Sequence, residues 1–548
     1  MSEATARSGP NAAASAGALA LAVLCSQQFI MAYDTVSMNV AISTIVVDLN
    51  TTLTGVQTVI AMYALVMAAF MVTGAKLADL WGRRRVFTLG ALTYGTGAGI
   101  TALSPSLGVM AFGWSLIEGL GAALVTPAIL TLATVNFAGA ARTRAFAAIG
   151  AVSGLGAATA PIIAGSLTTY LSWRISFALE VVVVLVVVSL RKHLAESRPE
   201  GSSSSFDWGG VALSALGFAL TVFGVILAST FGFWTARKDM VIGGVKLFTE
   251  GGISPVPVIV GMGLLVLVLF AAWERWGRIE RGREPLVRLS VLRLLPIRVG
   301  VVLMAALFLV MAGILFAVPV FTQVSLGYSA IESGVTMLPL SLSLLVAAFV
   351  ATRFSARGVA ADRLIRVGFL TLGAGCIVLA ISLVVTATKL SLAPSLVLVG
   401  LGLGLVLAII MDFVQSSAPS EQASEVAGFS RSVGYLGSSL GTALSGAVLI
   451  GVLIATGSSL LQQSEDLSSG QKEQFVEALE KSTQAVSDAQ LEAELKVQPP
   501  EVEQEVVSIY AQARNKGLQS AAALLGGVSL LAFLFAFRLK APAQRDGG

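Results

Sequence analysis

Two carboxylates stand inside long apolar runs, and they are the residues most able to do chemistry in this chain. Asp34 lies in Y-D-T-V-S-M-N-V-A (33–41), and Glu118 lies in W-S-L-I-E-G-L-G-A-A (114–123). A charge at the centre of a bilayer costs about 2.5–3.5 kcal/mol, so such acids are expected to face a protein interior and to take up protons near neutral pH. Each acid is therefore a candidate site for protons or cations, although Asp34 would also fit as a cap on polar neighbours in the bundle.

The runs that carry these acids predict membrane-spanning helices. Of the 548 residues, 55% are hydrophobic and 12% are charged, whereas soluble domains carry about 25% charged residues. Runs of about 20 apolar residues, the length of a transmembrane helix, recur along the chain, and we count fourteen of them. The sequence therefore predicts an all-α polytopic membrane protein with 14 transmembrane helices.

Basic residues in the loops predict the orientation of these helices. Three adjacent arginines, Arg83–Arg85, fill a short loop, and basic residues near helix ends stay on the cytoplasmic side. Alternate loops repeat the bias, while short loops on the other side hold few basic residues, such as Arg174 and Lys389. Both termini are therefore expected in the cytoplasm. The further basic residues on that side are Arg142, Arg144, Arg191, Lys192, Arg198, Arg275, Arg278, Arg281, Arg283, Arg288, Arg293, Arg298, Arg353, Arg357, Arg363, Arg366, Arg538 and Lys540.

The spans divide into six, two and six. We expect short helices in the extracytoplasmic insertion, with a break at Pro499-Pro500, and we favour a passive solvated excursion over a cap on the outer mouth. The predicted parts are a cytoplasmic tail (1–16), an N-terminal six-helix bundle (17–194), two inserted helices with flanking loops (195–298), a C-terminal six-helix bundle (299–537) that includes the insertion 456–517, and a cytoplasmic tail (538–548).

The arginine loop has a specific resemblance. Residues 77–85 read L-A-D-L-W-G-R-R-R, which resembles the signature loop of the major facilitator superfamily. The resemblance implies that Asp79, Gly82, Arg83 and Arg84 form a conformational latch that biases the outward-facing state. The alternative is a plain loop whose arginines only set the topology.

Further motifs resemble the fourteen-helix drug:proton antiporter subfamily of that superfamily. The Asp34 stretch is similar to its D-x-T-x-x-N-V-A motif. This resemblance implies a major facilitator fold of two six-helix bundles plus two inserted helices, and favours export over uptake. The residues that resemble its antiporter motif are Gly150, Gly154, Ala158, Pro161 and Gly165.

One departure from the subfamily pattern concerns the fourth span. The family's arginine position holds Ser115, and its glutamine position holds Glu118. Since that arginine is implicated in proton coupling, we expect Asp34 and Glu118 to carry the coupling here. Glu180 either pairs within the bundle or sets substrate specificity. The predicted residues of a central substrate cavity are Asp34, Tyr63, Ser115, Glu118, Glu180, Phe316, Gln323 and Asp412.

Asp412 and Arg431 stand near the cytoplasmic ends of two neighbouring spans. Each would otherwise be an unpaired charge within the membrane, so we expect an ion pair between them. A structural or gating pair is favoured over a contact between Asp412 and substrate.

Other classes of function find little support in the sequence. One histidine and two cysteines inside apolar runs argue against a metal site or a disulfide, and no phosphate-binding loop or catalytic motif occurs. We expect no enzyme, cofactor or nucleic-acid partner, but a monomer in the bilayer of the cytoplasmic membrane. It would export amphipathic cationic drugs or toxic compounds by alternating access, driven by the proton gradient. The alternatives are a dedicated exporter of a lipid or secondary metabolite and a non-transporting scaffold or sensor.

Overall fold

The computed structural model describes most of the chain as helix. The described residues are 10–197, 206–242, 245–279, 286, 289–418, 423–481, 491–492, 495–496 and 498–539. Parts of the predicted terminal tails, 1–9 and 540–548, lie outside the described residues. So do five basic residues used for the topology: Arg198, Arg281, Arg283, Arg288 and Lys540.

In the first bundle, called the N bundle here, α6 packs against α3 and α4, and α1 packs against α7. Polar caps begin several of its helices, because the side chains of Thr52, Ser106 and Ser172 accept hydrogen bonds from the first backbone N–H groups. Its elements are α1 (Pro10–Val40), α2 (Ile42–Asp48), α3 (Leu53–Trp81), α4 (Arg83–Ala102), α5 (Leu107–Met110), the π-helix η1 (Ala111–Glu118), α6 (Gly119–Asn136), α7 (Gly139–Tyr170), α8 (Trp173–Ser189) and η2 (Arg191–His193).

The second bundle, the C bundle, is built around α12 and α17, which pack closely together. Gly437 and Gly441 of α17 face backbone carbonyls of α12, so a side chain at either position would push the two helices apart. Its elements are η4 (Leu289–Arg293), α12 (Leu295–Val320), the π-helix η5 (Phe321–Ser325), α13 (Ala330–Thr336), α14 (Leu338–Ala356), α15 (Ala361–Ser382), α16 (Lys389–Ser416), α17 (Ala423–Gln463), α18 (Ser469–Lys481), α20 (Pro500–Phe535) and η6 (Ala536–Arg538).

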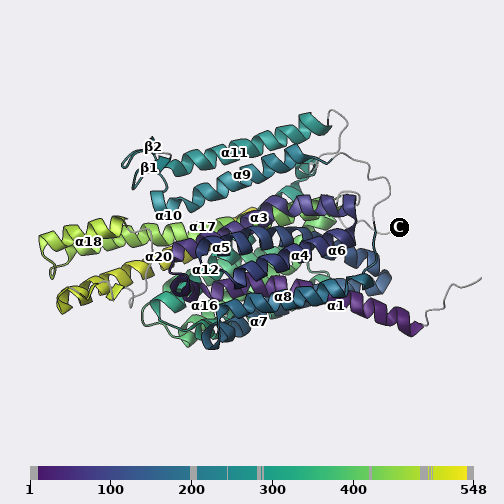
Figure 1. Cartoon of the computed structure of the whole chain (residues 1–548), viewed down its shortest axis with the longest axis horizontal. Coiled ribbons are helices and arrows are strands. Elements are labelled where there is room, and N and C mark those ends of the chain that lie inside the picture. Colours follow the sequence, from purple (N-terminus) through teal and green to yellow (C-terminus); the bar gives the residue numbers. More distant parts are fainter. Residues whose placement is uncertain are drawn as a thin grey trace, which may run out of the picture.

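Two further helices lie beside the junction of the bundles. Helix α9 packs on α11, and α9 also contacts α3 and α17, so the pair borders both bundles (Figure 1). An antiparallel hairpin of β1 and β2 joins them, which the sequence analysis did not predict. The elements are α9 (Trp208–Ile226), α10 (Ala228–Phe231), β1 (Met240–Ile242), β2 (Val245–Phe248), α11 (Pro255–Ala272) and η3 (Trp273–Ile279).

The helices confirm a multi-pass membrane protein, whereas the count of 14 spans stays a prediction. Within the described residues, 12 helices are long and apolar enough to cross a membrane. Helices α4 and α8, which cover two of the predicted spans, are not among them. Helix α8 has 17 residues, and α4 begins with three arginines.

The two ends of the segment predicted as an insertion, 456–463 and 500–517, are continuations of α17 and α20. Helix α17 runs on to Gln463, and α20 begins at Pro500, so both project past the rest of the C bundle together with α18 (Figure 1). The expected break at Pro499-Pro500 is the start of α20, because proline fits the first turn of a helix. We call this end, which also holds the β1–β2 hairpin, the hairpin end, and the end with Arg83–Arg85 the arginine end.

Candidate functional site

Three buried carboxylates meet inside the N bundle. Asp34 of α1, Glu118 of η1 and Glu180 of α8 are 0%, 0% and 1% exposed, and one oxygen of each lies within 4.8 Å of the others. We call these residues the acid cluster. The sequence predicted the first two as a pair and left Glu180 open between two roles. The structure brings Glu180 to the same point.

Two aromatic side chains donate hydrogen bonds to the acid cluster. Trp114 donates its Nε1–H to Asp34 Oδ1 at 2.8 Å, and the Tyr94 hydroxyl donates to Glu180 Oε2 at 2.9 Å. The ring of Tyr63 stacks on Trp114 with centroids 4.4 Å apart. Trp114 and Tyr94 were not predicted as site residues. Their signal in the sequence is an aromatic residue with a polar group inside an apolar run, which is common and therefore weak.

A local change of helix type positions Glu118. Residues 111–118 form the π-helix η1 in the middle of a longer helix, and this element carries Trp114, Ser115 and Glu118. Such π-helical turns are frequent at functional sites, since they re-aim side chains. Gly97 of α4 lies against the backbone of Glu118, where a side chain would collide, so α4 and η1 approach closely.

Several oxygens of the acid cluster have no hydrogen-bond donor. Both oxygens of Glu118, Oδ2 of Asp34 and Oε1 of Glu180 are buried without a partner. In the described part of the chain the basic residue buried to the same extent is Arg514, which contacts Ser325 and Tyr510 in the C bundle. Three carboxylates this close, without a cation, cannot all be charged. The arrangement can hold protons and, by its oxygen spacing, a cation.

The other predicted cavity residues lie in different surroundings. Ser115 donates to the backbone oxygen of Val59 at 2.7 Å, and Phe316 is buried in the apolar core of the C bundle. Gln323 lies between the bundles, where its Nε2 donates to the Val40 carbonyl oxygen at 3.0 Å. Thus the predicted residues of the N bundle come together, and those of the C bundle do not join them in this conformation.

The expected substrate cavity around the acid cluster stays a prediction, since the hollows found among the described residues lie elsewhere. Two hollows stand out in the described part of the chain. One lies between α14, α15 and α16, and the other lies beside Trp81, Arg84 and Glu196 at the arginine end. Neither is lined by a predicted cavity residue.

The expected ion pair between Asp412 and Arg431 does not form. Asp412 is exposed, and the ion pairs within 4.0 Å among the described residues do not include it. Arg431 is partly buried, and its Nε has no hydrogen-bond partner. The sequence placed both residues near the cytoplasmic ends of their spans. It did not reveal that the Asp412 side chain points away from the protein interior.

The predicted latch residues form a tight turn between α3 and α4. Gly82 has φ +100°, a conformation that side-chain-bearing residues rarely adopt, and Asp79 pairs with Arg83 at 3.6 Å. Arg84 pairs instead with Glu196, at 3.7 Å from its Nε, and its backbone N–H donates to the same carboxylate at 3.0 Å. The turn is thereby tied to the segment that follows α8, through a residue that the sequence analysis did not single out.

The predicted antiporter motif lies where α7 meets the C bundle. A Cβ added to Gly154 would collide with Leu345 of α14, and one added to Gly165 would lie 2.9 Å from the Ala330 oxygen of α13. Ala158 is buried, and the carbonyl of Pro161 lies against Gly334. Gly150 is exposed with no neighbour within 4 Å. The motif is thus a contact surface between the bundles along most of its length.

Comparisons with known proteins agree with this architecture. The Major Facilitator Superfamily model matches residues 24–442. The tetracenomycin C resistance and export protein of Streptomyces glaucescens is 30% identical over 434 residues, 78% of this chain and 74% of that protein. Puromycin resistance protein pur8 of Streptomyces alboniger is 28% identical over 442 residues, 79% and 82% of the two chains. The crystal structure of an auto-inhibited POT family peptide transporter matches with a TM-score of 0.59 and 15% identity over 96% of this chain and 99% of that chain, which shows the fold alone.

Proposed function

The chain belongs to the major facilitator superfamily, and we propose that it exports amphipathic, in particular cationic, compounds across the cytoplasmic membrane in exchange for protons. The proposal treats the chain as a transporter rather than an enzyme. The names of its relatives, which are antibiotic resistance or export proteins, support export as the direction of transport.

The observation that carries the proposal is the acid cluster. Its three carboxylates are buried within 4.8 Å of one another, and several of their oxygens have no donor. Such a group is stable when protons or a cation neutralise it. A cationic substrate that reaches these oxygens would displace protons, and protons entering from the other side would displace the substrate.

The aromatic residues give the acid cluster an orientation. Trp114 holds one oxygen of Asp34 by a hydrogen bond, which leaves the other oxygen of that carboxylate for a proton or a cation. The ring of Tyr63 stacks on Trp114 and supports the ring that holds this carboxylate. The faces of such rings attract organic cations, which favours a cationic amphiphile over a neutral one.

Alternating access requires the two bundles to separate at one end at a time. At the hairpin end they are joined by Gln57 of α3, Ser439 of α17 and Gln323 of η5, each of which donates a hydrogen bond to a backbone oxygen of the other bundle. We propose that these bonds break in the outward-facing state. In that scheme Asp79, Gly82, Arg83 and Arg84 form the latch at the cytoplasmic face, where both termini would also lie.

A second candidate function is export of one endogenous product, such as a secondary metabolite. The name of the tetracenomycin C export protein favours it, because that name refers to a single compound. The two candidates share the fold and the acid cluster, and the range of transported compounds distinguishes them. A narrow range would identify the dedicated exporter.

The test uses the purified full-length protein in proteoliposomes with an imposed proton gradient and a panel of cationic dyes and neutral lipophiles. Glu118→Gln keeps the size of the side chain and removes its charge, so gradient-driven transport of cations should fall at least tenfold. Glu473→Gln is the matched control, since Glu473 is an exposed carboxylate on α18. Full transport by Glu118→Gln, or equal loss in both variants, would overturn the proposal.

A further inference from the structure

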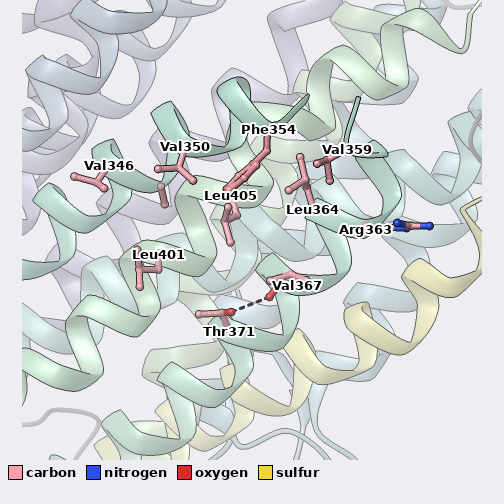
Figure 2. Close-up of a pocket in the computed structure, with 11 residues that line it drawn as sticks. Val346, Val350, Phe354, Val359, Arg363, Leu364, Val367, Thr371, Leu401 and Leu405 are labelled. Carbon is pink, nitrogen blue, oxygen red and sulfur yellow. Dashed lines mark hydrogen bonds between the residues drawn. The ribbon is translucent and has the colours of Figure 1, made fainter. Parts of the chain in front are cut away.

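A long apolar groove runs along the outer surface of the C bundle. Helices α14 and α15 pack on α16 rather than on each other, so a groove of about 360 Å³ remains between them with α16 as its floor (Figure 2). Glycines of α16 allow both helices to approach it, because Gly404 faces the backbone of α14 and Gly402 faces that of α15. All three helices belong to the membrane-spanning set, so the groove opens toward lipid.

The groove is apolar except at one end. Val346 and Val350 of α14, with Leu401 and Leu405 of α16, form its walls and floor. The Thr371 hydroxyl is already used, since it donates to the Val367 oxygen at 2.9 Å (Figure 2). The groove therefore offers a ligand no free polar group along its length.

Positive charge gathers where the groove reaches the arginine end. Arg363 lines the groove, and Thr371 follows it eight positions later, about 12 Å further along α15. Arg353 and Arg357, in the last turn of α14 and just after it, are also exposed. Among the described residues, no ion pair uses the guanidinium groups of these three arginines.

Arg366, on the same helix as Arg363, differs from these three arginines because the protein supplies partners for its charge. Arg366 pairs with Asp362, donates to the Ala536 oxygen and lies over the Phe537 ring. The protein itself supplies these partners, whereas Arg353, Arg357 and Arg363 are exposed and lack an ion-pair partner among the described residues. An apolar groove between membrane-spanning helices, with the exposed Arg363 in its lining, matches a molecule with an acyl chain and an anionic head.

We propose that this groove binds an anionic phospholipid, with one acyl chain between α14 and α15 and the phosphate at Arg363. The site is separate from the acid cluster, and the inference does not depend on the transported compound. An acyl chain that enters the groove exchanges one apolar environment, the bilayer, for another, so it contributes little binding free energy. The selectivity for one lipid over another therefore comes from the head group. Basic residues near a membrane surface favour an anionic lipid by about fivefold each, or about 1 kcal/mol.

The test measures lipid binding to the full-length protein by native mass spectrometry in detergent, with phosphatidylglycerol and phosphatidylcholine of identical acyl chains. Wild type should retain phosphatidylglycerol at least fivefold better than phosphatidylcholine. Arg363→Gln should reduce that preference about fivefold. Arg142→Gln is the matched control, because it removes one exposed positive charge at the same end of the N bundle and should leave the preference unchanged.

A second variant tests the groove itself. Val350→Trp fills the slot and should lower retention of both lipids, with gel filtration to confirm a folded protein. The proposal is overturned if Arg363→Gln and Arg142→Gln bind phosphatidylglycerol equally. It is also overturned if a transported amphiphile or a second copy of the chain, rather than a lipid, occupies the groove and is lost in Val350→Trp.

Discussion

Gln57 closes the hairpin end by joining α3 to α17, and its removal should open that end. Its Nε2 donates to the Thr442 oxygen at 2.6 Å and to the Ala443 oxygen at 3.4 Å, and the side chain is 5% exposed. Gln57→Leu keeps the approximate size and leaves these buried oxygens without their donor. Loss of the bond and of the donor costs about 1–3 kcal/mol. In the proposed scheme this contact joins the two bundles when the hairpin end is closed and is absent when that end is open. Its loss should therefore lower the equilibrium ratio of closed to open molecules by about 5- to 150-fold.

The assay is a distance measurement between spin labels at Val47 and Leu390, which are 71% and 82% exposed at the hairpin ends of the two bundles. Cys25 and Cys376 would first be replaced by alanine. Gln57→Leu should populate a longer distance than wild type. Thr58→Val is the control, since the Thr58 hydroxyl donates within its own helix, to the Thr54 oxygen at 2.8 Å. Equal distance distributions in the two variants would refute the reasoning.

Two further predictions concern the ion pair at the hairpin end and the glycines of α7. Burial alone would raise the pKa of Asp48, but hydrogen bonds from Arg174 and Trp173 outweigh it and hold that pKa below its usual value. The pair, worth up to about 1 kcal/mol at this exposure, should therefore stabilise the protein above about pH 4 and be lost as the pH falls below it. Arg174→Gln should reduce that acid-dependent drop in thermal stability, since the Trp173 hydrogen bond remains, and an unchanged drop would contradict the assignment. Gly165→Ala should lower thermal stability by about 1–3 kcal/mol through overpacking, whereas Gly150→Ala should not lower it, and equal losses would contradict the packing argument.

The helical architecture could be predicted because a bilayer demands apolar segments of a fixed length. Each predicted span coincides with a helix, including those that hold Asp34 and Glu118. The acids could be predicted because an ionisable group inside a membrane span costs free energy. Such a group is therefore expected to face the protein interior and to have a function there. The resemblance to the antiporter motif marked Gly154 and Gly165 of α7 as packing residues, and the structure shows that both face the C bundle.

Other features depend on three-dimensional contacts that a linear pattern does not contain. The π-helix η1 shifts the side chains of Trp114 and Glu118 relative to a regular α-helix, and no residue type marks such a turn. The partnership of Glu196 with Arg84 depends on the path of a loop. Asp412 was assigned a buried partner from depth alone, but helix rotation leaves its side chain exposed.

The central claim is that substrate and protons compete for the acid cluster. Its most direct test is substrate-induced proton release from the purified protein in weakly buffered detergent, with wild type beside Asp34→Asn, Glu118→Gln and Glu180→Gln. The account predicts that several cationic compounds release protons from wild type, and that each substitution reduces or abolishes this release. Unchanged release in all three variants, or cation binding without any proton release from wild type, would contradict it.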